Sequence, residues 1–202
     1  MLAGGTAGNE LLTSVTGAIL IVLLAALGLT IVRIGSLLWE HLLIGLLLLG
    51  PIALKLASTG YRFVRYYTGD ERYVEHGPPE LVLRLLAPLV VLSTLVVFAS
   101  GLVLLLGGPS TRATWLPIHK DSFFVWLALT AVHVLGHLPQ VAGGLRADYG
   151  PAIERLDHGA PGRSGRALAL ASALVLGAVL AVVLIPEFGA WIHAQPYFHH
   201  HH

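Results

Sequence analysis

Apolar and polar residues alternate along this chain in long blocks. Helices that cross a bilayer need about 20 predominantly apolar residues. Five stretches of the chain reach or approach that length, residues 11–34, 37–66, 81–106, 116–142 and 167–185. Because hydrocarbon offers no partner to backbone N–H and C=O groups, a spanning segment of this kind is expected to be helical. The pattern therefore predicts an all-α, multi-pass membrane bundle with five transmembrane helices.

Polar and turn-forming residues separate these stretches. Residues 61–79 are rich in charge and end in two prolines, which predicts an exposed loop, and residues 146–166 form a second polar connection. Pro51 lies in the middle of the second stretch and is expected to kink that helix. The fifth stretch carries no ionisable side chain and is expected at the periphery. The aromatic residues of 186–198 predict a segment at the membrane interface.

The composition agrees with this class of protein. Of 202 residues, 55% are hydrophobic and only 11% are charged, whereas soluble domains carry about 25% charged residues. There is no cysteine, which excludes covalent haem attachment, iron–sulfur ligation, thiolate zinc sites and disulfides. The net charge of +1, without a basic surface interleaved with aromatics, gives no indication of nucleic-acid binding.

The chain is expected to form one integral membrane domain over residues 1–198. The four histidines at 199–202 are interpreted as the remnant of a purification tag. Residues 1–9 contain no basic side chain before the first apolar stretch, so we expect a retained first span and not a cleaved signal peptide.

Lysine and arginine are distributed unequally between the two predicted faces. Eight fall on the side shared by the second and fourth connections: Arg62, Arg65, Arg72, Arg84, Arg146, Arg155, Arg163 and Arg166. Three fall on the opposite side: Arg33, Arg112 and Lys120. By the positive-inside rule, this difference predicts a cytoplasmic N-terminus and an external C-terminus in a plasma or inner membrane.

Histidines in the fourth apolar stretch supply its candidate chemistry. His119 stands near the start, and His133 and His137 lie deeper. Hydrocarbon cannot satisfy the donor and acceptor of an imidazole, so an ionisable residue in a span is by default a functional hypothesis. His119 and His133 are fourteen residues apart, which is four turns of a bundled helix and about 21 Å. Both then face the same neighbour, one near each membrane face, a geometry that suits two stacked haems.

The second apolar stretch repeats this spacing with one difference. An offset of 78 residues places His41 on His119 and Lys55 on His133. A plain apolar stretch with a glycine near its end precedes each of the two. The chain is thus interpreted as two related helix pairs plus one extra span, and both true duplication and chance similarity stay open.

Structural roles stay open beside the functional ones. His41 and His119 could be interfacial residues at helix starts, and His133 could hydrogen-bond across the bundle. Lys55 could extend toward the inner interface without any further role, neutralise a haem propionate, bind iron or relay protons. His137 follows His133 by one helical turn and could contact a propionate, the iron or a quinone.

This order of spans resembles the four-helix haem-binding core of cytochrome b from quinol-oxidising bc complexes. It is also similar to the small bacterial membrane cytochromes b that serve periplasmic oxidoreductases. The resemblance covers about residues 11–142 and rests on spacing and order. In these families each haem iron is held by one histidine from the second span and one from the fourth. The resemblance therefore implies one or two haems b as cofactors.

Carried over to this sequence, the resemblance implies that His41 and His119 ligate an outer haem. His133 would supply one ligand of an inner haem, but Lys55 stands where the family pattern has the second histidine. The inner site is then Lys/His ligated, five-coordinate, rebuilt around His137, or lost. An ammonium group has no lone pair, so only deprotonated lysine could bind iron. The outer site is the more complete of the two.

The implied function is electron transfer between the membrane quinol pool and a partner at the outer face. The chain has no G-x-G-x-x-G motif and no soluble domain, so an electron-transfer subunit is expected rather than a self-contained enzyme. The absence of an H-E-x-x-H motif argues against a metalloenzyme of that type. Two alternatives remain, a haem-free bundle with a proton or solute pathway and an anchor subunit. Homo-oligomerisation is left open.

Overall fold

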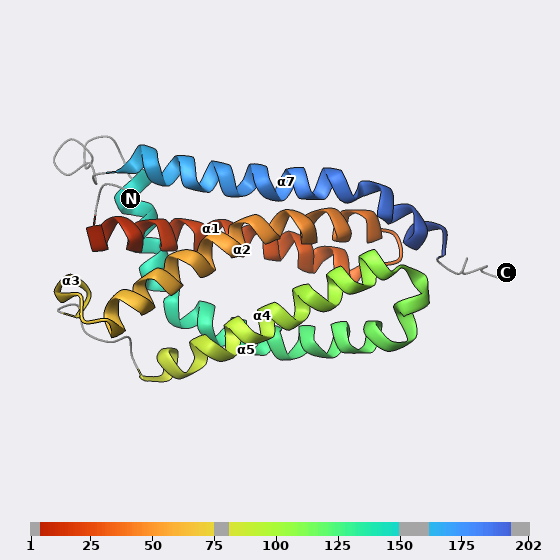
Figure 1. Cartoon of the computed structure of the whole chain (residues 1–202), viewed down its shortest axis with the longest axis horizontal. Coiled ribbons are helices and arrows are strands. Elements are labelled where there is room, and N and C mark those ends of the chain that lie inside the picture. The colour runs from red at the N-terminus through yellow and green to blue at the C-terminus, as the bar shows by residue number, and fades with distance from the viewer. Residues whose placement is uncertain (1–4, 75–80, 150–161, 195–202) are drawn as a thin grey trace.

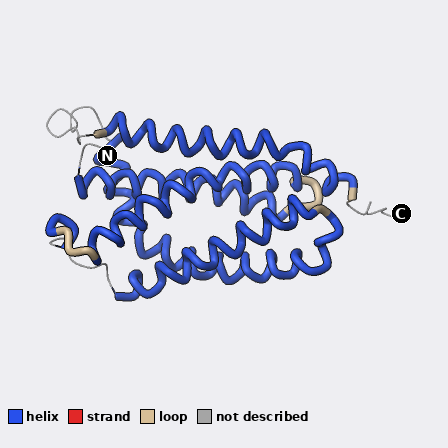
Figure 2. The backbone as a smooth tube through the Cα atoms, in the orientation of Figure 1, coloured by secondary structure: helices blue, strands red, loops and turns tan. Residues whose placement is uncertain are grey.

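The computed structural model describes residues 5–74, 81–149 and 162–194. Over these residues it is helical, without strands (Figure 2). The elements are α1 (Gly5–Val32), α2 (Leu38–Tyr67), α3 (Glu71–Val74), α4 (Leu81–Gly107), the 3₁₀ helix η1 (Pro109–Thr111), α5 (Arg112–Tyr149) and α7 (Arg163–His193). Five of them, α1, α2, α4, α5 and α7, are long and apolar enough to cross a membrane. The predicted all-α bundle with five spanning helices is thereby confirmed.

The helices run up and down in sequence order (Figure 1). α1 and α2 form one antiparallel hairpin, and α4 and α5 form a second. α1 packs against both α2 and α5, and in the described residues α2 and α5 do not form a packed pair of their own. The two helices that carry the candidate histidines therefore belong to different hairpins, and α1 contacts both.

The α2 helix ends one residue beyond the predicted apolar stretch of residues 37–66, which overlapped the predicted loop of residues 61–79. It continues to Tyr67, so the first part of the predicted loop, residues 61–67, is helical. The helix ends where Gly69 adopts a positive φ of 79°, a conformation that glycine reaches without a steric penalty. Arg65 and Asp70 form an ion pair across this turn. Charge alone suggested a loop here, but the helix stops at the glycine, and residues 75–80 lie outside the described part.

α7 packs chiefly along α2 and lies at one edge of the bundle in Figure 1. The two backbones approach closely at two glycines: a Cβ on Gly50 would lie 1.9 Å from the carbonyl oxygen of Ala173, and one on Gly177 would lie 2.2 Å from that of Leu47. Small residues permit such contacts between membrane helices. Pro51 is buried beside this contact, inside a helix that continues through it.

Two of the C-terminal aromatic residues pack inside the bundle, while the position of this segment at the membrane interface stays a prediction. α7 extends to His193, and both Phe188 and Trp191 are buried in a cluster with residues of α2 and α4. The Trp191 indole N–H donates to the carbonyl oxygen of Leu104 at 3.0 Å. These side chains therefore join α7 to the bundle at the end where α2 begins. Residues 195–198 of the predicted segment lie outside the described part.

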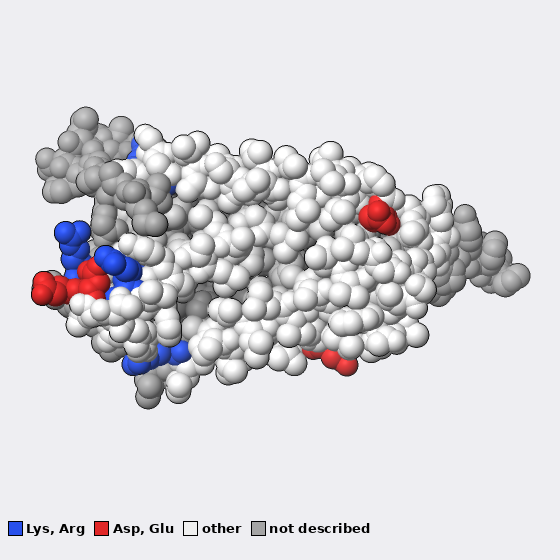
Figure 3. Space-filling model, in the orientation of Figure 1, with Lys and Arg blue, Asp and Glu red and all other residues white. Residues whose placement is uncertain are grey.

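The outward-facing surface has the character of a lipid-facing one. Val22, Leu29 and Leu176 are 68%, 71% and 67% exposed, and a water-soluble protein rarely exposes continuous apolar surface of this extent. In Figure 3 the charged side chains gather mainly at one end of the molecule, and the broad middle carries few. This distribution is that of a membrane protein whose central belt contacts the bilayer.

The close contact between α2 and α7 predicts opposite effects for two alanine substitutions in the same helix. Gly50→Ala should lower the free energy of unfolding by about 1–3 kcal/mol, because a methyl group there collides with backbone that cannot move aside cheaply. Gly45 has no neighbouring atom within 4 Å of an added Cβ, so Gly45→Ala should be neutral or stabilising. Unfolding in detergent measures both, and equal stability of the two variants would contradict the contact.

Candidate functional site

The structure brings His41 and His119 together at one end of the bundle. His41 lies in the first turn of α2, and His119 lies two turns into α5. The up-and-down topology places the beginnings of both helices at the same end, and the two imidazoles are within electrostatic reach of each other. Both rings are partly buried. The two residues predicted for an outer site therefore lie at the same end of the bundle.

The hydrogen bonds of His119 define which of its nitrogens carries the proton. Its Nδ1 lies 3.1 Å from the carbonyl oxygen of Val97 and 3.1 Å from Oγ of Ser100, both on α4. A carbonyl oxygen only accepts hydrogen bonds, so Nδ1 must be the donor. The Ser100 hydroxyl already donates to Val97. In the neutral ring, the lone pair is then on Nε2.

His41 has its hydrogen-bond partner on α1. Its Nδ1 lies 3.0 Å from Oγ1 of Thr30. The Thr30 hydroxyl also lies 2.6 Å from the carbonyl oxygen of Leu27, to which it can donate its one proton. In that arrangement the Thr30 oxygen accepts from the imidazole, and Nδ1 of His41 is the donor. Thr30 is 4% exposed, so this network is well shielded from competing solvent.

Both histidines are consequently prepared to bind a metal through Nε2. A metal-bound histidine almost always donates its other ring N–H to a carbonyl, carboxylate or water, and this bond fixes ring orientation and raises ligand basicity. Thr30 and Ser100 supply that bond from the helix preceding each histidine. The two hairpins thus repeat one local arrangement, with a hydroxyl on the first helix and an imidazole on the second.

Gly101 makes room for the His119 ring. A Cβ at this position would lie 3.0 Å from Cε1 of His119 and 3.4 Å from its Nδ1, closer than nearly all real contacts. The ring therefore rests against the α4 backbone where a larger residue would displace it. Gly28 on α1 behaves differently, because an added Cβ there would meet no atom within 4 Å. Close helix packing at Gly28 is not what the structure shows.

The donor set distinguishes between kinds of metal centre. No group of three or more histidine or acidic side chains that could hold a metal ion occurs in the described residues. Structural and catalytic zinc sites use three or four protein ligands. A haem iron already has four macrocycle nitrogens and takes its axial ligands from side chains such as histidine. Two histidines with available Nε2 atoms fit a haem better than a bare metal ion.

Lys55 lies in the other half of the bundle, where it links α2 to α1. Its ammonium donates to the carbonyl oxygen of Thr13 at 2.7 Å. The Thr13 hydroxyl lies 3.1 Å from that of Ser58, and the side chain of Asn9 donates to the Ser58 carbonyl at 3.2 Å. Arg62 and Glu10 pair at 3.1 Å on the same interface. Lys55 is thus one member of a row of polar contacts between α1 and α2.

His133 and His137 also lie in this half and face each other. Their ring centroids are 4.6 Å apart, and His133 is within electrostatic reach of Lys55. In contrast to His41 and His119, Nδ1 of His133 is buried without a hydrogen-bond partner in the described residues. The hydroxyl oxygen of Thr130, one turn earlier, is in the same state. The three residues predicted for an inner site are brought together, but without the locked geometry of the other pair.

Thr30 and Ser100 are the functional candidates that the sequence interpretation missed. Each is a hydroxyl side chain inside an apolar span, which is the available signal, because such a group needs a partner in hydrocarbon. The equivalence of these two hydroxyls is not evident from their distances in sequence to the histidines. Thr30 precedes His41 by 11 residues, and Ser100 precedes His119 by 19. The turn between α1 and α2 differs in length from the turn between α4 and α5. The offset of 78 residues therefore does not align the two hydroxyls.

Comparisons with protein-family models, with curated proteins and with solved structures each find no match for this chain. The chemistry of the site is therefore deduced from its own donors, distances and burial.

Proposed function

We propose that this chain is a membrane b-type cytochrome that binds haem between α2 and α5 through His41 and His119. The observation that carries the proposal is that Nδ1 of each ring is engaged by the preceding helix, which leaves Nε2 of each ring without a hydrogen bond in the described residues. An interfacial histidine at a helix start needs no such bond. Two such rings, one from each hairpin and at the same end of the bundle, would supply the two side-chain ligands of one haem iron.

The haem supplies the one-electron redox chemistry, and the protein controls ligation and environment. His41 and His119 hold the iron from opposite hairpins. Thr30 and Ser100 fix the two rings and increase their basicity, which favours the oxidised metal. The surrounding apolar helices exclude water and lower the local dielectric, a second influence on the potential.

The distribution of charge supports an orientation for this electron carrier. By the positive-inside rule, eight lysines and arginines on one side against three on the other favour an orientation with the His41–His119 end at the outer face. We infer electron transfer between the membrane quinol pool and a redox partner outside the cytoplasmic compartment. The chain would act as a subunit of a larger pathway.

The inner half fits a second haem less well. Lys55 is engaged as a hydrogen-bond donor to Thr13, and a protonated amine has no lone pair for iron. His133 lacks the Nδ1 partner that orients an iron ligand. We therefore propose one haem per chain, at the His41–His119 pair, and treat Lys55 as a tether between α1 and α2.

The unpartnered polar atoms of the inner half favour the second candidate function. The buried Nδ1 of His133 and hydroxyl of Thr130 lie one turn apart, beside His137 and Lys55. Such a group of exchangeable protons suits a proton or solute pathway in a haem-free bundle. Uptake measurements in vesicles, with Lys55→Met as the blocked variant, distinguish this activity from electron transfer.

An absorption spectrum of the purified protein, oxidised and dithionite-reduced, tests the main proposal. We expect a low-spin b-type spectrum with one haem per chain, lost in His41→Ala and in His119→Ala. His193→Ala is the control, because His193 is exposed at the end of α7. A folded wild-type protein that takes up no haem would refute the cytochrome function and favour the haem-free bundle.

The hydrogen bonds to the two rings predict unequal effects of removing the hydroxyls. Thr30→Val removes the hydroxyl that accepts from Nδ1 of His41 and should weaken haem binding about 10-fold or more. Ser100→Ala should have a smaller effect, because His119 keeps the Val97 carbonyl. The midpoint potential should rise more in Thr30→Val, and Thr30→Ser should restore it. If Thr30→Val and Thr30→Ser had the same haem affinity and the same midpoint potential, the role of the hydrogen bond between Thr30 and His41 would be contradicted.

The Lys55→Met variant distinguishes two roles for Lys55, a link between α1 and α2 and a ligand of iron. If Lys55 links α1 to α2, haem content and spectrum stay unchanged while the melting temperature falls, because the contact with Thr13 is lost. Haem quantification and thermal unfolding of the same preparation give both values. A loss of one of two haems would instead identify Lys55 as an iron ligand.

A further inference from the structure

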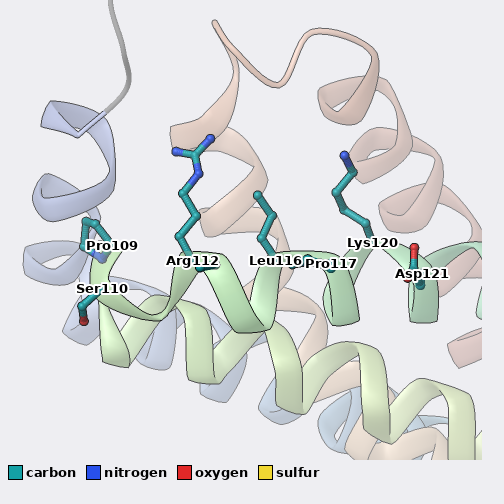
Figure 4. Close-up of a pocket in the computed structure, with 8 residues that line it drawn as sticks. Pro109, Ser110, Arg112, Leu116, Pro117, Lys120 and Asp121 are labelled. Atoms are coloured by element: carbon teal, nitrogen blue, oxygen red, sulfur yellow. The ribbon is translucent and has the colours of Figure 1, made fainter.

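A pocket of about 610 Å³ opens at the end of the bundle where α4 ends and α5 begins. Its lining belongs to η1 and the first turns of α5, and the lining residues with polar or charged side chains are Ser110, Arg112, Lys120 and Asp121. Figure 4 shows the side chains of Arg112, Leu116 and Lys120 extending to the same side of α5. The pocket therefore presents two cations with an apolar side chain between them.

These three side chains follow one ridge of α5. Arg112, Leu116 and Lys120 are each four residues apart in the chain, a spacing that puts side chains next to one another on one face of a helix. From first to last they span about 12 Å along the helix axis. The two cationic side chains thus leave the helix at opposite ends of the ridge, and a ligand that contacts both must itself be extended.

The charge of the pocket favours an anion. Neither Arg112 nor Lys120 forms an ion pair within the described residues, where the salt bridges involve Arg62 and Arg65. Asp121 is the acidic residue of the lining, so the two cations exceed the carboxylates by one. The first turn of α5 contains no acidic residue, and the positive end of the helix dipole adds to the attraction. A single phosphodiester group would balance the excess positive charge.

Tryptophans indicate the depth of this end in the bilayer. Of the four in the chain, Trp39 lies in the first turn of α2, Trp115 in the first turn of α5 and Trp191 in the last turn of α7. The up-and-down topology brings these three turns to the same end of the bundle (Figure 1). Tryptophan is enriched where hydrocarbon meets the lipid headgroups. We therefore expect the pocket to open at the depth of the lipid phosphates.

We propose that this pocket binds the headgroup of an anionic phospholipid, with Arg112 and Lys120 contacting the phosphodiester and the oxygen atoms next to it. A free phosphate is compact, whereas cavities of about 300–1,000 Å³ hold extended, drug-sized ligands. Leu116 supplies apolar surface between the cations, which suits the glycerol and ester end of a lipid better than a soluble ion. The guanidinium group matches phosphate oxygens with paired N–H donors. Neither His41 nor His119 lines the pocket, so the assignment is independent of haem binding.

Titration with two lipids tests this assignment. The full chain in a non-ionic detergent is titrated with phosphatidylglycerol and with phosphatidylcholine of the same acyl chains, and native mass spectrometry counts the bound lipids. We expect the wild type to bind phosphatidylglycerol about tenfold more tightly, the effect of one hydrogen bond to a charged group. Arg112→Gln and Lys120→Gln should each reduce this preference toward unity. Arg33→Gln is the matched control, because it removes one exposed positive charge at the same end but outside the pocket.

Three results would overturn the lipid assignment. Equal affinity of the wild type for both lipids would mean that the pocket does not select an anionic headgroup. An equal loss of preference in Arg33→Gln and Arg112→Gln would attribute the preference to the general charge of this end. If inorganic phosphate displaced phosphatidylglycerol at equal concentration, the site would be one for a soluble anion. None of these results bears on the proposed haem ligands, which the pocket does not include.

Discussion

The hydrogen bond from each imidazole to the preceding helix is the interaction on which the candidate site depends. Within a bilayer, a polar side chain has no water to bind, so its partner must come from the protein. Thr30 and Ser100 meet this need for His41 and His119. When each hydroxyl donates its own proton to a carbonyl oxygen of its helix, its oxygen accepts the hydrogen bond from the imidazole. The constraint that makes buried histidine costly thereby selects the tautomer that a metal ligand requires.

Helix packing keeps these bonds in place. α2 is held from one side by α1, through Lys55 and the polar row near it, and from the other by α7, through the close contacts at Gly50 and Gly177. The buried cluster around Phe188 and Trp191 joins α7 to the end where α2 begins. α7 carries no candidate ligand, yet it packs on the helix that presents His41. Its position at the edge of the bundle is therefore compatible with an indirect role, in which it restrains α2.

Hydrophobic blocks were sufficient to predict five spans and their order, because block length depends on local geometry. The same order predicted that His41 and His119 lie at one end of the bundle. The loop predicted over residues 61–79 overlapped the second stretch of residues 37–66, and its first part was wrong. Charge between residues 61 and 67 indicated a loop, whereas the helix ends where Gly69 adopts a positive φ. Thr30 and Ser100 were missed because their contacts depend on the turns between helices, which differ in length. The burial of Phe188 and Trp191 depends likewise on α7 packing that no single stretch encodes.

The two halves of the bundle differ in how many of their buried polar groups form hydrogen bonds. This difference bears on whether the α1–α2 and α4–α5 pairs repeat one arrangement. Where His41 and His119 lie, both first helices provide a hydroxyl. In the other half, the lysine of the first pair binds the backbone of α1, and the histidine of the second pair has an unpartnered nitrogen. A lysine cannot replace a histidine as a ligand while it remains an ammonium. Lys55 is a hydrogen-bond donor, and it joins α2 to α1 through Thr13. A symmetric second site would need a histidine at position 55 of α2 to face His133, and the sequence has none there.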